Sequence, residues 1–327
     1  MGIRILRADV VRRLLPMDEC IALMERTMIG VSAGRAVVPL RSIMVMPGDR
    51  GMLGNMPGYL AEPECFGVKL VSLIPRNQPP LHSSHLGLVL LFEPQHGRPV
   101  ALLDGAQITA IRTAAASGLA TNWLARSDAG DLALLGAGEQ AQSHLQAMSC
   151  VRALRRVRVW ARDPDKARKF ALAEGVRHGM EIEVSDTVEA AVRGADIVCT
   201  LTKAREPILK GAWLAPGAHV NVVGSSVATA AEVDTEAVVR SRLFVDRRDS
   251  TVHEGGEYLR ALTEGAISAS HILGEIGEVA AGTVPGRRAP SDLTMYKSLG
   301  IAAQDLAAGY YVFERAVAAG LGQVIDW

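Results

Sequence analysis

The amino-acid sequence predicts an α/β protein, with a Rossmann-type doubly wound parallel sheet joined to a discontinuous α+β domain. The first observation is the segment 131–141, DLALLGAGEQA, which reads as a strand, a glycine turn and the start of a helix. Gly136, Gly138 and Ala141 stand at the positions of a G-x-G-x-x-G/A dinucleotide fingerprint. The second observation is a regular alternation of apolar strands and helical segments after this point, which is typical of a parallel sheet.

Each residue of the fingerprint has a physical reason. Gly136 permits the tight turn, Gly138 lets the backbone approach a pyrophosphate, and the small Ala141 allows the helix to pack on its strand. Glu139 and Gln140 open the helix, whose free N–H groups and dipole favour a phosphate. A single fingerprint is weak evidence, so its surroundings have to decide.

Length and charge limit the classes of function. The 327 residues are enough for two domains, each with its own core. Lys+Arg and Asp+Glu both total 35, so the net charge is zero, which argues against nucleic acid or an anionic membrane as the main partner. No apolar run reaches the ~18 residues of a membrane span.

Cysteine usage and the first residues indicate the compartment. The four cysteines are widely spaced without a C-x-x-C pair, which favours reduced, mostly buried thiols. The first residues, MGIRILR, lack a signal-peptide pattern, so we expect a cytoplasmic protein. His82 and His85 lie three apart, but no third ligand has suitable spacing, and we expect no metal site.

The first third of the chain is mixed α+β. Apolar spacing predicts helices over 16–34 and 109–125, and strands over 37–46, 67–74 and 87–93. Turns are predicted around 47–49 and 78–80, and the loop 127–130 is the predicted domain boundary.

The alternation that follows gives the Rossmann domain. Strands are predicted over 132–135, 157–160, 181–184, 197–201, 220–223 and 243–245. Helices are predicted over 140–150, 164–174 and 187–193, and the tail from 296 to 319 also reads as helical.

The end of the second strand bears on the choice of cofactor. Enzymes that prefer NAD usually carry an acid there for the ribose hydroxyls, but this chain has Ala161 or Arg162 at the position. An arginine can bind a 2′-phosphate, so we favour NADP over NAD. Asp163 follows directly and could supply the expected acid, so NAD remains the alternative cofactor. Arg162 can instead be a solvated loop residue.

A series of segments then narrows the class of protein: GVKLV (67–71), LFE (91–93), ALLDG (101–105), ITAIRTAAAS (108–117), LGAGEQ (135–140), ADIVCT (195–200), NVVGS (221–225) and YKSLG (296–300). In this order the chain resembles the ornithine cyclodeaminase/μ-crystallin family. The resemblance implies a homodimer, a substrate-binding and dimerisation domain over 1–126 with the helix 302–327 returning to it, and a Rossmann domain over 127–301. Activities in the family include cyclodeamination, imine reduction and amino-acid dehydrogenation.

The resemblance also implies roles for particular residues. The substrate carboxylate is expected on Arg41, Lys69 and Arg112, and a guanidinium suits a carboxylate because it donates two parallel bonds. Lys69 is also a candidate proton relay, while Arg41 can instead be an exposed charge at a strand end. The matched segments place further residues beside the cofactor, namely Ser84, Arg112, Thr113, Thr200, Val223, Gly224 and Ser298.

One position departs from the family pattern. Where the cyclodeaminases carry an acid/base aspartate after a strand, this chain has Ser226. A lone serine is too weak an acid or base for cyclodeamination, whereas reduction of a protonated cyclic imine needs less. We therefore expect an NAD(P)H-dependent reductase of 1-pyrroline-2-carboxylate, with a role for the 1-piperideine homologue. Ornithine cyclodeaminase, an open-chain imino acid dehydrogenase and a non-catalytic NADPH-binding crystallin-like protein remain the alternatives.

Overall fold

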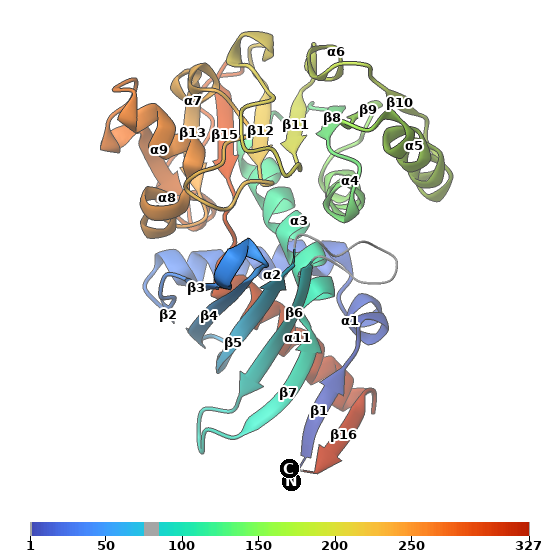
Figure 1. The fold of residues 1–327 in the computed structure, drawn as a ribbon, viewed down its shortest axis with the longest axis vertical. Helices are drawn as coiled ribbons and strands as arrows, with labels where there is room; N and C mark the ends of the chain where they lie inside the picture. Colours follow the sequence, from blue (N-terminus) through green and yellow to red (C-terminus); the bar gives the residue numbers. More distant parts are fainter. Residues whose placement is uncertain (1, 75–84, 327) are drawn as a thin grey trace. The chain divides into compact units, whose positions relative to one another are not determined.

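The computed structural model describes residues 2–74 and 85–326 and divides the chain into two compact units. Unit 1 comprises Met1–Arg112 and Ile301–Trp327, and unit 2 comprises Thr113–Gly300. Figure 1 shows the helices and strands of each unit. The sequence predicted the boundary in the loop 127–130, and in the structure the chain passes between the units within a helix, α3 (Gly105–Leu124).

Unit 1 contains a mixed eight-stranded sheet in the order β16-β1-β7-β6-β5-β4-β2, with β3 pairing to β4. The strands are β1 (Gly2–Leu6), β2 (Ala36–Val37), β3 (Ser42–Val45), β4 (Met52–Ala61), β5 (Glu64–Leu73), β6 (His85–Phe92), β7 (Pro99–Asp104) and β16 (Gln323–Asp326). Its helices are α1 (Ala8–Leu14), α2 (Met17–Ser32), the short η1 (Pro47–Asp49) and α11 (Ala302–Ala318), together with the start of α3.

One face of this sheet is covered by α11, which packs on β4, β5 and β6. Small residues make the close approach possible. A Cβ at Gly67 would lie 2.2 Å from the carbonyl oxygen of Leu90 and 3.0 Å from Leu306 of α11, so only glycine fits there. Val89 and Leu91 of β6 are fully buried on the helix side.

The alternate residues of the same strands are apolar and exposed. Leu86 and Leu88 of β6 are 56% and 46% exposed, and Leu53 of β4 and Met44 of β3 are also exposed. A strand that is apolar on both faces is usually buried on both. We call this second face, whose apolar side chains are exposed in the single chain, the apolar sheet face: Met44, Leu53, Leu86 and Leu88.

Unit 2 contains an eight-stranded sheet in the order β10-β9-β8-β11-β12-β15-β13-β14, and all its pairs are parallel. The strands are β8 (Asp131–Leu135), β9 (Arg156–Trp160), β10 (Ile182–Val184), β11 (Ile197–Thr200), β12 (His219–Val222), β13 (Ser241–Val245), β14 (Ile272–Glu275) and β15 (Leu293–Lys297). The α-helices are α4 (Glu139–Val151), α5 (Pro164–His178), α6 (Val188–Val192), α7 (Thr235–Arg240), α8 (Arg248–Glu254), α9 (Gly256–Thr263) and α10 (Ile276–Ala280), with 3₁₀ turns η2 (Gly211–Trp213) and η3 (Ala269–His271).

The strand order confirms the predicted fold class. The first strand, β8, lies between β9 and β11, so the order reverses beside it, as in a doubly wound sheet. Ligands of such sheets bind outside the carboxyl ends of the strands at this reversal. The strands are buried on both faces, with Leu132, Ile197 and Val220 fully inaccessible.

Some predicted elements need correction. The tail was predicted as helix from 296, but 293–297 form β15 between β12 and β13, and α11 begins only at Ala302. Apolar residues in a short run do not distinguish a buried strand from a helix. The C-terminal helix also ends at Ala318, after which 323–326 pair with β1, and the predicted strand 37–46 is two strands, β2 and β3.

Within the described residues the four cysteines form no disulfide; three are buried and Cys150 is exposed. The cytoplasmic location stays a prediction. None of the helices in the described ranges has the length and hydropathy to cross a membrane.

Candidate active site

Two basic side chains meet one buried carboxylate in unit 1. Lys69 Nζ and Arg112 Nε each lie 2.9 Å from Oδ1 of Asp305. The three side chains are 3%, 4% and 0% exposed, so this is an ion cluster in the interior. Lys69 comes from the middle of β5, Arg112 from α3 and Asp305 from the first turn of α11.

The neighbours of the cluster fix its orientation and charge. Arg112 Nη1 donates to Oε1 of Gln304 at 2.6 Å, so α11 holds the guanidinium at two points. Burial lowers the pKa of Lys69 to about 8; Asp305 opposes this, and Arg112 and Arg41 add to it. Arg41, in the segment between β2 and β3, is half-buried.

The arrangement carries a net positive charge. Lys69, when protonated, and Arg112 supply two cationic groups, and Asp305 supplies one anion. Buried charge needs compensation, so a ligand carboxylate would stabilise the cluster. Two of the three predicted carboxylate-binding residues, Lys69 and Arg112, thus contact the same carboxylate. The charge of the third, Arg41, acts on the pKa of Lys69.

The predicted cofactor residues of unit 2 gather at one edge of its sheet. Trp160, Leu135, Thr200, Val222 and Lys297 are aligned across five neighbouring strands. The predicted residues stand at or just after these ends: Gly136, Ala161, Arg162, Thr200, Val223, Gly224 and Ser298. This is the carboxyl edge at which a doubly wound sheet binds its ligand.

The two glycines of the fingerprint have different roles. Gly136 has φ +133°, and a Cβ there would lie 2.7 Å from the carbonyl oxygen of Leu201. Gly138 is exposed, precedes α4 as its N-cap, and has nothing within 4 Å of where a Cβ would be. Gly136 is therefore required by the fold, whereas Gly138 leaves open space at the helix N-terminus.

Several buried polar atoms near the predicted cofactor positions lack partners in the described part of the chain. They are Thr113 Oγ1, Gln140 Oε1 and Ser298 Oγ. Such groups are rare in folded proteins and are normally satisfied by water or a ligand. Together with the open space at Gly138, they fit a bound dinucleotide.

The end of β9 bears on the ribose. Asp163 Oδ1 accepts the backbone N–H of Asp165 at 3.0 Å and so caps α5. Arg162 is exposed and Ala161 half-buried. Asp163, the carboxylate that left NAD as the alternative cofactor, thus caps a helix.

A carboxylate that the sequence analysis missed joins two of the strand ends. Glu232 accepts from Thr200 Oγ1 at 2.7 Å and from the Gly224 N–H at 2.6 Å through Oε2. Its Oε1 accepts from the backbone N–H and the hydroxyl of Thr202, at 2.7 and 2.6 Å. Burial raises the pKa of Glu232, while the bonds from Thr202 and Thr200 favour its charged form.

The turn after Gly224 contains two serines with different environments. Ser225 is buried; its hydroxyl donates to Glu257 at 2.8 Å, and Lys297 Nζ donates to its carbonyl at 2.6 Å. Burial opposes ionisation of Glu257, but Lys297, 2.9 Å away, holds the pKa of this carboxyl below its usual range. Ser226 is only half-buried.

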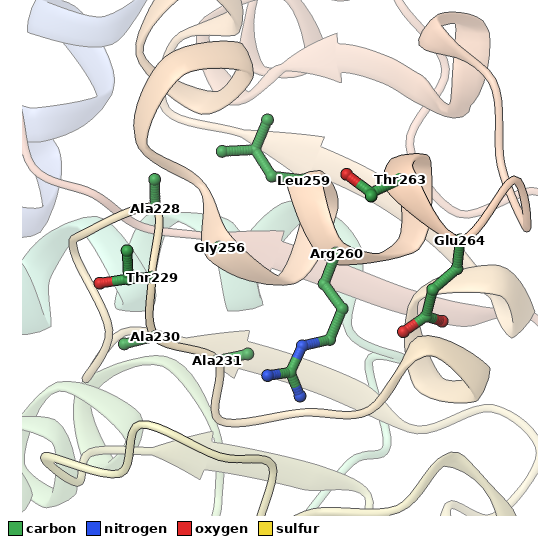
Figure 2. Close-up of a pocket in the computed structure, with 9 residues that line it drawn as sticks. All are labelled: Ala228, Thr229, Ala230, Ala231, Gly256, Leu259, Arg260, Thr263 and Glu264. Carbon is green, nitrogen blue, oxygen red and sulfur yellow. The ribbon is translucent and has the colours of Figure 1, made fainter.

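The segment after Ser226 lines a surface pocket of about 300 Å³ with α9 (Figure 2). Its charged side chains already have partners. Arg260 pairs with Glu206 at 2.8 Å, and Glu264 accepts from Thr235 at 2.5 Å. We therefore assign this pocket no ligand.

The comparisons with known proteins agree with this geometry. The model of the ornithine cyclodeaminase/mu-crystallin family matches residues 3–320. This chain belongs to that family. Ketimine reductase mu-crystallin of Rattus norvegicus is 38% identical over 282 residues, 86% of each protein. Delta(1)-pyrroline-2-carboxylate reductase of Bacillus cereus is 32% identical over 324 residues, 99% of each.

Solved structures of the family are similar over the whole chain. The Thermococcus litoralis Delta(1)-pyrroline-2-carboxylate reductase, in complex with NADH and L-proline, has a TM-score of 0.96 and 36% identity, covering 99% of this chain and 100% of that one. An archaeal alanine dehydrogenase dimer with bound NAD has a TM-score of 0.94 and 30% identity, with full coverage of both chains.

The site also contains residues that no sequence motif indicates. Gln304, Asp305, Glu232 and Glu257 are buried polar side chains among small or apolar neighbours. That contrast was the available signal, since a buried charge needs a partner. Ser84 lies outside the described residues. Within residues 2–74 and 85–326, no group of three or more His, Cys, Asp or Glu is arranged to hold a metal ion.

Proposed function

We propose that this protein reduces cyclic ketimine carboxylates with NAD(P)H, converting 1-pyrroline-2-carboxylate to L-proline and 1-piperideine-2-carboxylate to L-pipecolate. The observation that carries the proposal is the buried cluster of Lys69, Arg112 and Asp305, with its excess of positive charge. The similarity to ketimine and pyrroline-2-carboxylate reductases supports the same substrate class.

In the reaction, the residues of this chain bind the substrate carboxylate and donate a proton. Arg112 and Arg41 bind the substrate carboxylate, which restricts the orientation of the C=N bond. When bound, the reduced nicotinamide supplies the hydride that adds to the carbon of this bond. Lys69, with a pKa of about 8, holds a proton near neutral pH that it can give to the substrate nitrogen.

For the cofactor we propose NADP in preference to NAD. The support is the capping role of Asp163, which engages the nearest carboxylate, and the exposed Arg162 beside it. A guanidinium can form paired bonds with a 2′-phosphate. The similar solved structures contain NADH or NAD, so both cofactors belong in the assay.

We further propose a homodimer formed through the apolar sheet face. Leu86 and Leu88 expose about half of their surface in the single chain. Contiguous apolar patches of this kind usually mark an interface. The similar alanine dehydrogenase is described as a dimer.

Cofactor oxidation tests the function directly. Purified protein is mixed with each ketimine and with NADPH or NADH, and the absorbance of the reduced cofactor is followed. Oxidation with a cyclic ketimine is the expected result; oxidation of neither cofactor would sink the proposal. Proline and ammonia from ornithine with catalytic NAD would indicate a cyclodeaminase, and tight NADPH binding without turnover a crystallin-like binding protein.

A further inference from the structure

A single oxygen of Asp305 holds both cations of the substrate cluster. Oδ1 lies 2.9 Å from Lys69 Nζ and 2.9 Å from Arg112 Nε. The second oxygen, Oδ2, is buried and has no hydrogen-bond partner among the described residues. A carboxylate that only stabilised the fold would gain from bonds to both oxygens. This one instead brings two cations to the same point.

Helix α11 makes this carboxylate rigid. Asp305 lies in its first turn, where the helix dipole favours a negative charge. The preceding residue, Gln304, accepts from Arg112 Nη1 at 2.6 Å, and its amide nitrogen donates to Met28. The guanidinium is thus held through Nε and Nη1.

The charge around Lys69 comes from three elements. Asp305 on α11 favours the ammonium form, and Arg112 on α3 and Arg41 in the segment after β2 oppose it. Gln304, also on α11, is neutral and bonded to Arg112. With two cations and a buried site working against it, Lys69 depends on one carboxylate to keep its proton.

We propose that Asp305 is the positioning residue of the substrate site, holding Lys69 and Arg112 side by side and keeping Lys69 protonated as the proton donor to the substrate nitrogen. This inference rests on the proposed reductase function. In the reaction, the carbon of the protonated C=N group takes the hydride, and the π electrons become the lone pair of a neutral amine nitrogen. Lys69 Nζ then gives its proton to that nitrogen, the product leaves as an ammonium, and neutral Lys69 regains a proton from water.

The pH profile of kcat/KM separates this role from a structural one. In the native enzyme activity should fall above a pH of about 8, where Lys69 loses its proton. In Asp305→Asn we expect this alkaline limb to move down by about one pH unit or more, so that activity partly recovers on acidification. Arg41→Gln should move the limb upward, because it removes a cation. The substrate's own ionisation is common to all variants.

Two further variants serve as controls. Asp305→Glu keeps the charge and should retain the native limb while lowering kcat, because a longer side chain displaces both cations. Glu174 is another fully buried carboxyl with an unpartnered oxygen, paired with Arg177 on α5. Glu174→Gln should lower thermal stability and leave the limb unmoved. An Asp305→Asn limb that coincides with the native one would overturn the inference.

Binding of pyrrole-2-carboxylate, a planar analogue of the ketimine, gives a readout that needs no turnover. In calorimetric titrations at a series of pH values, the affinity for the analogue should fall as Lys69 loses its proton. In Asp305→Asn this fall should occur at lower pH. If the native protein shows no turnover but this shift is present, the reductase function fails and the positioning of Lys69 by Asp305 stands. If the analogue binds both proteins with the same pH dependence, the positioning role is wrong.

Discussion

Oε2 of Glu232 lies 2.6 Å from the backbone nitrogen of Gly224 and accepts its hydrogen. The other oxygen accepts from Thr202, so one side chain fixes the turns after β11 and β12. These turns form part of the predicted cofactor edge. The bond therefore links a residue with no motif of its own to the geometry of the dinucleotide site.

Replacing Glu232 with glutamine should weaken cofactor binding. The amide group presents N–H to donors that need an acceptor, so at least one bond is lost, at a cost of about 1–3 kcal/mol in stability. We expect the KM for the cofactor to rise roughly tenfold, with a smaller change in kcat. Glu236→Gln, an exposed carboxyl on α7, is the matched control. A destabilised protein with an unchanged cofactor KM would limit Glu232 to a structural role.

The two fingerprint glycines should respond differently to alanine. Gly138→Ala meets no atom within 4 Å, so the protein should fold normally. The added methyl group occupies the approach to the helix N-terminus, and cofactor affinity should fall on the order of tenfold. Gly136→Ala, at φ +133° and 2.7 Å from a carbonyl oxygen, should instead lose about 1–3 kcal/mol of stability. Calorimetry and thermal unfolding measure the two effects; normal cofactor affinity in Gly138→Ala would contradict the assigned phosphate position.

Arg162 should set the preference for NADP. Arg162→Ala is expected to lower kcat/KM for NADPH by about tenfold and leave that for NADH nearly unchanged, because only the 2′-phosphate contact is lost. Asp163→Ala removes the cap of α5 and should cost about 1 kcal/mol of stability without changing the ratio of the two cofactors. Equal losses for NADPH and NADH in Arg162→Ala would count against the 2′-phosphate contact.

A charge on the apolar sheet face should prevent dimerisation. Leu88→Glu places a carboxylate on β6 where the proposed interface is apolar, and burying an unpaired charge is strongly unfavourable. Light scattering should report a monomer, or a dimer that dissociates on dilution. Leu172→Glu on α5, where the native side chain is 75% exposed, tests for a general effect of surface charge. A native protein that is monomeric at all concentrations would remove the proposal.

Two buried histidines should make the protein sensitive to acid. Burial lowers the pKa of His144 to about 4 and, with Arg287 nearby, that of His219 to about 3. An unfolded histidine titrates near pH 6.5, so the unfolded chain binds more protons below that pH. The free energy of unfolding should therefore be highest above pH about 6.5 and fall as the pH approaches about 4, on the order of 3 kcal/mol per histidine.

Denaturant titrations across this range check the effect. His219→Gln keeps one hydrogen-bonding group and should flatten the pH dependence, whereas His253→Gln, at an exposed position, should leave it unchanged. A stability that does not vary between pH about 7 and about 4.5 would contradict the proton linkage.

The sequence was most informative where backbone geometry or strong periodicity decided the structure. The strand–turn–helix at 131–141 and the alternating elements after it were predicted because glycine spacing and apolar runs report directly on local structure. Strand β4 was not predicted, because its apolar pattern is interrupted by Gly54, Asn55, Pro57 and Gly58. Pro57 is tolerated there because it lies between the parts of β4 that pair with β3 and with β2.

The carboxylates of the site could not be predicted in the same way. Asp305 is 236 residues from Lys69 and 193 from Arg112. Nothing local distinguishes it from an acidic residue that starts a surface helix, and only the fold brings it to its partners. The role of Glu232 could not be predicted for the same reason, because its four hydrogen bonds come from residues on other strands and turns.

Helix α11 follows unit 2 in the sequence, and this order has a consequence for synthesis. A growing chain that has reached residue 300 already contains every residue of unit 2, while unit 1 still lacks α11 and β16. Until then Lys69 and Arg112 have no Asp305 beside them, and the sheet face that α11 covers is open to water. Chains generally fold domain by domain as they emerge. The dinucleotide-binding half can therefore form first, and substrate recognition becomes possible only when α11 leaves the ribosome.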